Sequence, residues 1–387
     1  MTLQLFNSLT RTKQGFSSLE NKKVKLYVCG ITPNNATHLG HAFTYISFDI
    51  LVRYLNYKEY NVMYLQNATD INDSDDVIKQ AKADGRTWRE EAEYWIKHFH
   101  RQMDALNVLK PTHYVLATSV MDKIIEINSR LVEKKYAYTS GGNLYFDTSK
   151  FPEYGKLSHL TKDEMLMIPE DRGTNIHDKN KHNPLDFVLW FGDSAKPNWN
   201  SPWGKGRPGW HIECSTMINS VLGPKIDIHG GGEDLIYPHH ESEIAQSESY
   251  TGKKPFVKTW MHTAYVLYEG KKMSKSLGNL ILVSDLLKKY SPETIRWAIL
   301  SHHYRKPWEF NESELEKFEK NIQLIKKSLL DITVNHELRT NSLLKEFERL
   351  MDDDLNTPAV LTLVEKLIKE DKKEEAKKIL QILGFDF

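Results

Sequence analysis

The sequence has little cysteine, no long apolar run and no excess of charge of either sign. Its two cysteines, Cys29 and Cys214, are too few for a disulfide framework, so we expect a reducing, cytoplasmic compartment. No stretch approaches the roughly 20 apolar residues of a membrane span, and the N-terminus lacks the apolar run of a signal peptide. The 52 basic and 52 acidic side chains cancel, which argues against a polybasic arm for nucleic acid or membrane.

The chain begins with a strand–helix–strand pattern. Residues 23–30 alternate as a half-buried strand does, residues 41–57 carry apolar side chains at helical spacing, and residues 60–70 form a second predicted strand. Further strands, each followed by a turn or loop, are predicted within 225–235 and 260–279. A strand–helix–strand unit indicates a parallel sheet, so we expect an α/β protein.

A turn with two histidines joins the first predicted strand to its helix. The letters HLGH place His38 and His41 around Gly40. Amides at the start of a helix attract phosphate, the glycine lets a nucleotide come close, and imidazoles can donate hydrogen bonds to phosphate oxygens. Taken alone, such a turn is more often an ordinary surface turn than a site.

A lysine-rich loop lies much later in the chain. The letters KKMSKSLGN (271–279) follow another predicted strand and supply Lys272, Lys275 and two hydroxyl groups. Ammonium groups on a flexible loop suit the binding of a triphosphate. Alone, this loop would also be more often a solvated surface feature. Together and in this order, the two motifs resemble the two signatures of class I aminoacyl-tRNA synthetases.

The two cysteines lie in segments that also carry candidate metal ligands. Cys29 ends the first predicted strand, Cys214 lies within 206–217, and His239 and Glu243 are four apart, on one face of a predicted helix. Thiolate, imidazole and carboxylate groups can hold zinc tetrahedrally. The spacing alone equally fits two buried core cysteines and a helix-capping histidine.

Five stretches make the chain similar to the cysteine-activating branch of class I synthetases. They are YVCGIT, GRPGWHIECS, DIHGGGEDLIYPHHESEIAQSE, WMHTAYVLYEGKKMSKSLGN and MDDDLNTP, and the similarity covers nearly the whole chain. An enzyme that selects cysteine over the nearly isosteric serine cannot rely on shape, whereas a borderline-soft metal binds thiolate far better than hydroxyl. This context favours zinc at the two cysteines.

Two families share this pattern: the synthetase that charges tRNA, and its paralogue, the ligase of mycothiol biosynthesis, which joins cysteine to the amine of glucosaminyl-inositol. The letters CGITPNNATHLGHAFTY, YLQNATDI, GRTWREEAE, ALNVLKPTHYVLATS and HHYRKPWEF are more similar to the ligase. One segment departs from it: Arg172 and Gly173 match a ligase motif, but Thr174 and Asn175 do not. We therefore expect this chain to be a member of the ligase family. The mismatch at Thr174 and Asn175 bears on the identity of the acceptor more than on the activation of cysteine.

The resemblance implies a set of site residues. One zinc ion per chain would be held by Cys29, Cys214 and His239, with Glu243 as the candidate fourth ligand. ATP, used with Mg²⁺, would meet His38, His41, Lys272 and Lys275. The cysteinyl-adenylate would lie along Gly30, Ile31, Thr32, Thr44, Asn67, Ala68, Thr69, Trp210, Gly232, Glu233, Asp234 and Val266. Trp210 also fits a core residue, and Asp234 fits either a ribose ligand or the base that deprotonates the acceptor.

The same resemblance implies the fold class and the division of the chain. We expect a Rossmann-type parallel-sheet catalytic core with an insertion and a C-terminal helical bundle. The expected segments are 1–135 (first half of the core), 136–195 (connecting insertion), 196–282 (second half, with the zinc site and the lysine-rich loop) and 283–387 (helical bundle, with no anticodon-binding domain).

The predicted reaction has two steps. ATP and L-cysteine give cysteinyl-AMP and pyrophosphate, and an amine acceptor, glucosaminyl-inositol, then attacks the mixed anhydride. The expected enzyme is a zinc-dependent, AMP-forming ligase and a cytoplasmic monomer that binds small molecules and no membrane. One alternative is a compact cysteinyl-tRNA synthetase with tRNA as its partner. Another is a binding or regulatory module without activity, against which the intact histidine and lysine motifs argue.

Overall fold

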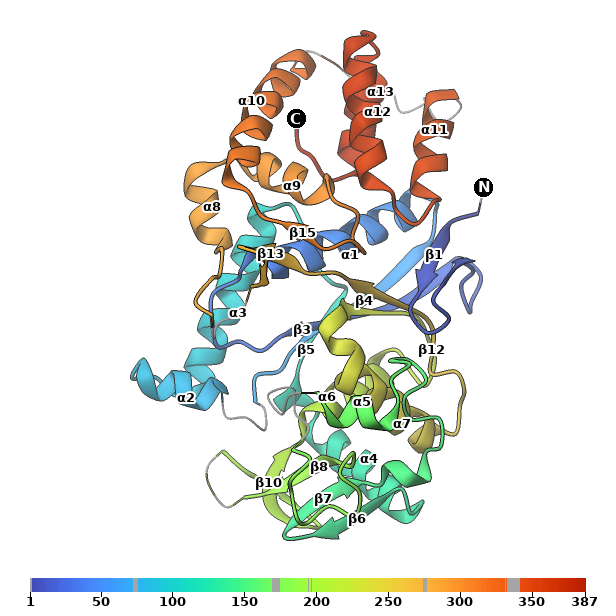
Figure 1. Ribbon diagram of the computed structural model, residues 1–387, viewed down its shortest axis with the longest axis vertical. Helices are drawn as coiled ribbons and strands as arrows, with labels where there is room; N and C mark the ends of the chain where they lie inside the picture. Colours follow the sequence, from blue (N-terminus) through green and yellow to red (C-terminus); the bar gives the residue numbers. More distant parts are fainter. Residues whose placement is uncertain are drawn as a thin grey trace.

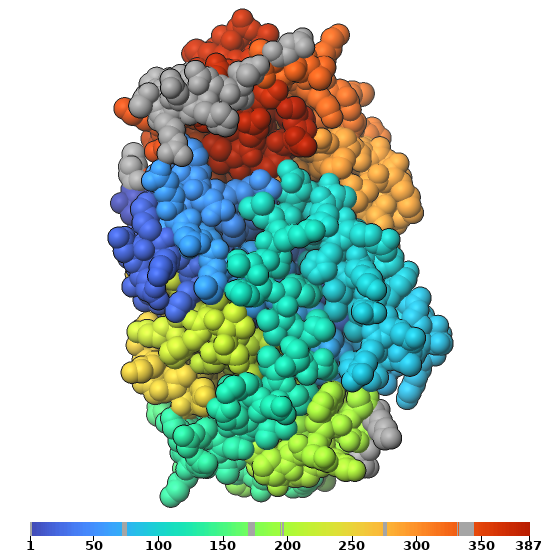
Figure 2. All heavy atoms as spheres, turned by 180° about the vertical axis from the view of Figure 1, so that it is seen from behind, coloured from blue at the N-terminus to red at the C-terminus, as the bar shows by residue number. Residues whose placement is uncertain are grey.

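A parallel sheet lies at the centre of the molecule, between a small antiparallel sheet at one end and a bundle of helices at the other (Figure 1). The computed structural model describes residues 2–71, 76–168, 175–193, 195, 197–273, 277–330, 332 and 342–387. Figure 2 shows the same two ends from behind, with the residues around 80–110 between them. Among the helices so described, none combines the length and the apolar character needed to cross a membrane.

The central sheet has the strand order β12-β11-β3-β4-β5, and every pair in it is parallel. Its strands are β3 (Lys23–Ile31), β4 (Asn61–Ala68), β5 (His113–Leu116), β11 (Ile226–Gly232) and β12 (Val257–Thr263). The prediction of a parallel α/β fold from the first 70 residues is confirmed.

The two faces of β3 belong to two different cores. Val24, Leu26 and Val28 pack in the core that contains α1 (Leu39–Tyr57) and the C-terminal helices. Tyr27 and Cys29 pack in the core that contains α4 (Met121–Glu133), α6 (Trp210–Val221) and α7 (Glu241–Thr251). Because side chains alternate along a strand, one apolar strand can bury both faces.

The segment between the two halves of the sheet forms the antiparallel sheet, in the order β6-β7-β8-β10-β9. Its strands are β6 (Ala137–Ser140), β7 (Asn143–Phe146), β8 (Phe187–Gly192), β9 (Trp199–Ser201) and β10 (Gly204–Pro208). The remaining elements before the bundle are β1 (Gln4–Asn7), β2 (Thr12–Gly15), α2 (Asp76–Ala83), α3 (Trp88–Ala105), α5 (Lys162–Leu166), β13 (Val266–Tyr268) and β14 (Lys271–Lys272).

From residue 283 onward the described chain is helical, apart from β15 (Trp308–Glu309). The helices are α8 (Val283–Lys289), α9 (Pro292–Leu300), α10 (Glu312–Leu329), α11 (Ser342–Met351), α12 (Thr357–Lys369) and α13 (Lys373–Ile382). Ser291 and Asn356 accept hydrogen bonds from the first turns of α9 and α12, and each of these helices has a proline at its start. These are the usual sequence signals of a helix N-terminus.

A buried ion pair ties this bundle to the sheet. The Arg296 side chain on α9 is 1% exposed and pairs with Asp49 on α1, which is fully buried. Its guanidinium also donates to the carbonyls of Leu383, at 2.7 Å, and Leu106, at 3.0 Å. One side chain therefore joins the last residues of the chain to α1 and to the end of α3, because a buried guanidinium must find partners for its donors.

We expect Arg296→Ala to lower the free energy of unfolding by about 3 kcal/mol, because it leaves Asp49 and two buried carbonyls short of donors. Guanidinium-induced unfolding followed by circular dichroism would measure the change. Arg349→Ala is the control, since Arg349 pairs with Glu346 on an exposed helix surface, where such pairs contribute little to stability. Equal losses in the two variants would contradict the structural role of Arg296.

Candidate active site

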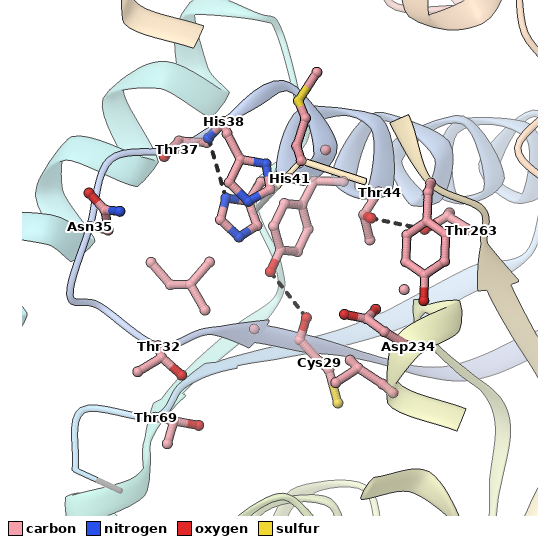
Figure 3. A pocket seen from close by; sticks show the side chains of 18 of the residues that line it. Cys29, Thr32, Asn35, Thr37, His38, His41, Thr44, Thr69, Asp234 and Thr263 are labelled. Atoms are coloured by element: carbon pink, nitrogen blue, oxygen red, sulfur yellow. Dashed lines mark hydrogen bonds between the residues drawn. The ribbon is translucent and has the colours of Figure 1, made fainter. Parts of the chain in front are cut away.

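A cavity of about 430 Å³ opens where β3, β4, β11 and β12 end, next to the start of α1 (Figure 3). Crevices at the carboxyl ends of parallel strands are the usual ligand sites of such sheets. Most of the predicted site residues line this cavity: Cys29, Gly30, Ile31, Thr32, His38, His41, Thr44, Asn67, Thr69, Trp210, Cys214, Gly232, Asp234, His239, Val266 and Lys272. Ala68, Glu233 and Glu243 are absent from the lining, and Lys275 lies outside the described residues.

The two histidines of the HLGH turn lie stacked on one side of the cavity. Their ring centroids are 3.7 Å apart, and His41 Nδ1 accepts a hydrogen bond from the backbone N–H of His38 at 3.4 Å. Burial, with the charge of Lys272, lowers the pKa of His38 to about 4, and burial also lowers the pKa of His41. Both imidazoles are therefore neutral near pH 7, so they can donate one hydrogen bond each but carry no charge.

His38 also has an unmet hydrogen-bonding atom. Its Nδ1 is buried and has no hydrogen-bond partner in the part of the chain that the structure describes. Buried polar atoms are normally paired, and exceptions often mark ligand sites. The atom belongs to the residue immediately before α1, where backbone amides also favour an anion.

Lys272 also lines the cavity and is held by a carboxylate. Its Nζ is 2.8 Å from Asp234 and 4.4 Å from the centre of the Tyr265 ring. The segment after the lysine-rich loop returns to the histidine turn: Leu39 donates its N–H to the carbonyl of Ile281 at 2.8 Å. The two motifs, far apart in sequence, therefore meet in one pocket.

At Gly30, β3 and β4 approach each other closely. A Cβ at this position would lie 1.6 Å from the carbonyl oxygen of Asn67, so only glycine fits. The Asn67 side-chain oxygen accepts hydrogen bonds from the Gly30 N–H, at 2.7 Å, and from the Tyr27 hydroxyl, at 2.8 Å. Asn67 thus fixes the strand end that carries Cys29.

The predicted thiol site forms at the inner end of the cavity. Ligand atoms of Cys29, Cys214, His239 and Glu243 all lie within 4.8 Å of one another, and all four residues are buried. His239 Nε2 is 3.1 Å from Glu243 Oε1. The hydrogen bond with Cys29 lowers the pKa of Cys214 to about 6, which favours a thiolate. Two sulfurs, one imidazole and one carboxylate match the donors that zinc prefers.

Neighbouring histidines orient these groups. His211 Nδ1 lies 2.9 Å from His239 Nδ1, so the other ring nitrogen of His239 is left for the cluster. His229 Nε2 lies 3.1 Å from the second oxygen of Glu243. Burial opposes a charge on His239, but Cys214 and Glu243 outweigh it and raise the pKa of His239 to about 10. Such partners commonly fix the orientation of metal ligands.

Sequence reasoning missed a second set of donors. Cys29, His229, His240 and Glu243 also lie within 4.8 Å of one another, and Cys29 Sγ is 3.3 Å from His240 Nε2. The signals were present in the letters DIHGGG and PHHES, but their spacing does not say which histidine faces the thiols. The set with two sulfurs suits zinc better, because thiolate is the softer ligand.

Trp210, which also fitted a core residue, lines the cavity and is half-buried. Its ring stacks on that of His239, with centroids 4.2 Å apart and planes 17° apart. It therefore forms part of the cavity wall beside the thiol cluster, where it can cover one face of the His239 ring.

The comparisons identify the family. Residues 15–320 match the family described as "tRNA synthetases class I (C) catalytic domain". The chain belongs to this family. A cysteine–tRNA ligase from Dehalococcoides mccartyi is 44% identical to this class I synthetase over 378 residues, which cover 95% of this chain and 80% of that protein. A cysteine–tRNA ligase from Coxiella burnetii is 43% identical over 374 residues, covering 96% and 79%.

A solved structure of similar fold is the methionyl-tRNA synthetase of Mycobacterium tuberculosis in complex with methionyl-adenylate. It has a TM-score of 0.67 and 16% sequence identity, and the match covers 93% of this chain and 89% of that one. At this identity the likeness concerns the fold alone. The expected architecture, a class I synthetase core followed by C-terminal helices, is confirmed.

The expected assignment to the mycothiol-pathway ligase is wrong. The curated relatives, which are 40–48% identical over most of the chain, are cysteine–tRNA ligases. The short stretches that suggested the ligase include the strand and turn that line the cavity. The two families share these elements, so such stretches do not discriminate between acceptors. Arg172, Gly173 and Thr174, which lie in the segment that departed from the ligase, are outside the described residues.

The low pKa of the two turn histidines gives a prediction for stability. Their folded-state pKa lies below the unfolded value of about 6.5, so stability is fully present above pH 6.5 and is lost as the pH falls toward 4. Between pH 7 and pH 5, we expect the free energy of unfolding to fall less in the double variant His38→Asn/His41→Asn than in the wild type. The difference should be at most about 1.4 kcal/mol per pH unit for each of the two histidines.

Urea unfolding at several pH values would measure this difference, with the exposed His177→Asn as the control variant. The same slope in the wild type and the double variant would show that the imidazoles titrate normally in the folded protein.

Proposed function

We propose that the protein activates L-cysteine with ATP and transfers the cysteinyl group to a hydroxyl at the 3′ end of tRNA. One observation supports this most: a single cavity joins the HLGH turn and Lys272 to a buried two-thiol cluster. The family membership supports the ATP-dependent ligase chemistry, and the 40–48% identical cysteine–tRNA ligases support tRNA as the acceptor.

In the first step, the cysteine carboxylate attacks the α-phosphorus of ATP and pyrophosphate leaves. Neutral His38 and His41 would donate hydrogen bonds to phosphate oxygens, beside the N-terminus of α1. Lys272 would exchange its partner Asp234 for phosphate, which places a positive charge where negative charge develops. Mg²⁺ bound to ATP would neutralise part of the remaining charge.

Cys29, Cys214, His239 and Glu243 would hold one zinc ion, because their donor types and mutual distances fit it. When bound, zinc offers a ligand position that prefers the thiolate of cysteine over the hydroxyl of serine. His211 and His229 would keep His239 and Glu243 oriented, and Trp210 would keep water from the cluster.

In the second step, a ribose hydroxyl of tRNA attacks the carbonyl of cysteinyl-AMP and AMP leaves. Asp234 already pairs with Lys272 and lies at the end of β11, where acids commonly bind ribose hydroxyls. This supports the ribose-ligand role for Asp234 over the role of a general base.

The function is tested with purified protein, ATP, Mg²⁺, cysteine and cysteine tRNA. We expect cysteine-dependent ATP–pyrophosphate exchange and cysteinyl-tRNA as the product, identified by mass spectrometry. Serine should be activated roughly ten-thousand-fold less efficiently, because a hydroxyl leaves the metal-side subsite unsatisfied. Exchange with cysteine but no transfer to tRNA would contradict the proposed acceptor, and comparable exchange with serine would contradict the thiol-reading site.

The zinc ligands are tested by four single variants. We expect about one zinc per wild-type chain, measured by mass spectrometry of the metal, and its loss in Cys214→Ala and His239→Ala. His240→Ala is the control, because this histidine belongs only to the second donor set. His229→Ala should weaken zinc binding without abolishing it, because His229 orients Glu243 in the first set. Retention of zinc in His239→Ala together with its loss in His240→Ala would place the metal in the second set.

A further inference from the structure

The turn between α11 and α12 carries three consecutive aspartates that contact three different parts of the molecule. Asp352 accepts a hydrogen bond from the Tyr54 hydroxyl on α1 at 2.7 Å. Asp353 is about half exposed and pairs with Lys13 on β2. Asp354 faces the segment after α9. The backbone of this turn also pairs with β1, which lies beside it in Figure 1.

Asp354 is buried and fully hydrogen-bonded. Its Oδ1 accepts from the Phe6 N–H at 2.8 Å and from the Tyr304 hydroxyl at 2.6 Å. Its Oδ2 accepts from Nε and Nη2 of Arg305, both at 2.6 Å. The Arg305 guanidinium in turn lies 4.3 Å from the centre of the Phe6 ring. Both carboxylate oxygens thus have two donors, an arrangement that holds Tyr304 and Arg305 firmly.

The backbone is strained at the residue that carries this carboxylate and at the next one. Asp354 and the next residue, Leu355, have φ values of +61° and +56°, in the left-handed region that non-glycine residues rarely adopt. Such strain persists only where surrounding contacts enforce it, and it concentrates at sites with a role beyond packing.

Tyr304 and Arg305 begin the segment that holds one wall of the active-site cavity. The carbonyl of Tyr304 accepts the N–H of Ala264 at 2.8 Å, and further along Phe310 donates to the carbonyl of Leu267 at 2.8 Å. Between these bonds, β15 pairs with β13. Ala264, Tyr265 and Val266 line the cavity.

The same wall carries Lys272. β13 pairs on its other side with β14, in the register Leu267 to Lys272. A shift of residues 304–310 would therefore move both the cavity wall and the ammonium group proposed to bind phosphate. The thiol cluster is built on other elements, namely β3, α6 and the segment from His239 to α7, so it would be affected less.

We propose that Asp354 is a positioning residue for ATP: through Tyr304 and Arg305 it holds the wall formed by residues 264–272 in register with the HLGH turn. The C-terminal helices thereby support the nucleotide half of the pocket and not the thiol half. The inference rests on the proposed function insofar as ATP is the ligand of that half.

We expect Asp354→Asn to raise the KM for ATP in pyrophosphate exchange by roughly tenfold, because a shift of the wall by a fraction of an ångström weakens every contact it makes. The KM for cysteine and the zinc content should change less than about twofold. Titration calorimetry with a non-hydrolysable ATP analogue would give the same loss as a direct affinity.

Two neighbours provide matched controls. Asp352→Asn alters an equally buried carboxylate of the same turn, one that accepts a hydrogen bond from Tyr54 on α1, and Asp353→Asn alters an exposed one. Both should leave the KM for ATP unchanged even if Asp352→Asn lowers the melting temperature. Tyr304→Phe, which removes only the hydroxyl bond, should weaken ATP binding less than Asp354→Asn and combine with it non-additively.

An unchanged KM for ATP in folded Asp354→Asn, or an equal rise in Asp352→Asn, would overturn the proposal. If Asp354→Asn fails to fold, Tyr304→Phe decides: a rise in the KM for ATP with the KM for cysteine unchanged supports the proposal, and no rise overturns it. A wild-type protein without cysteine-dependent exchange would instead refute the proposed function, while calorimetry with the analogue would still test the role of Asp354.

Discussion

The close approach of β3 and β4 at Gly30 is the constraint on which the pocket depends. The Asn67 carbonyl occupies the space of the missing side chain, and the Asn67 side chain ties Gly30 and Tyr27 together. On one side of this contact Cys29 enters the core of α6 and α7, and on the other the chain turns into the HLGH motif. A side chain at position 30 would clash with the Asn67 carbonyl and so displace Cys29 relative to the HLGH turn.

The two halves of the pocket, the HLGH turn and the thiol cluster, accommodate buried ionisable side chains in different ways. At the HLGH turn, burial keeps both imidazoles neutral, so they can donate hydrogen bonds without the cost of a buried cation. At the thiol cluster, opposite charges in contact outweigh burial: they raise the pKa of His239 and lower that of Glu243, so their charged forms are retained. A metal ion would fit this second arrangement, since its donors converge, and a phosphate would fit the first.

The C-terminal bundle is connected to the catalytic core through polar anchors as well as through apolar packing. Arg296 ties α9 to α1 and to the last residues of the chain, and Asp354 ties the turn before α12 to the wall of the pocket. Buried polar contacts of this kind are directional, so they define the position of the bundle more closely than apolar contacts alone would. This gives the bundle a structural reason to influence chemistry that takes place elsewhere.

By itself the sequence determined the α/β class, the strand-to-helix position of the HLGH turn and the residue types of the thiol site. These features follow from local periodicity and from short motifs, which neighbouring residues decide. Short motifs were misleading where two families share them, because they indicated the wrong acceptor. Relatives that match most of the chain corrected this assignment.

Only the tertiary structure decided which groups meet across long sequence separations. Cys29 and Glu243 are 214 positions apart, and His229 on β11 and His240 in the short helical segment before α7 join them. Lys272 on β14 pairs with Asp234, which follows β11. The letters MDDDLNTP mark the turn that carries Asp354, but they do not reveal its contacts, because its partners Phe6, Tyr304 and Arg305 lie at least 49 positions away. Such contacts depend on how the sheet and the helices pack, and this packing cannot be inferred from the periodicity of the sequence.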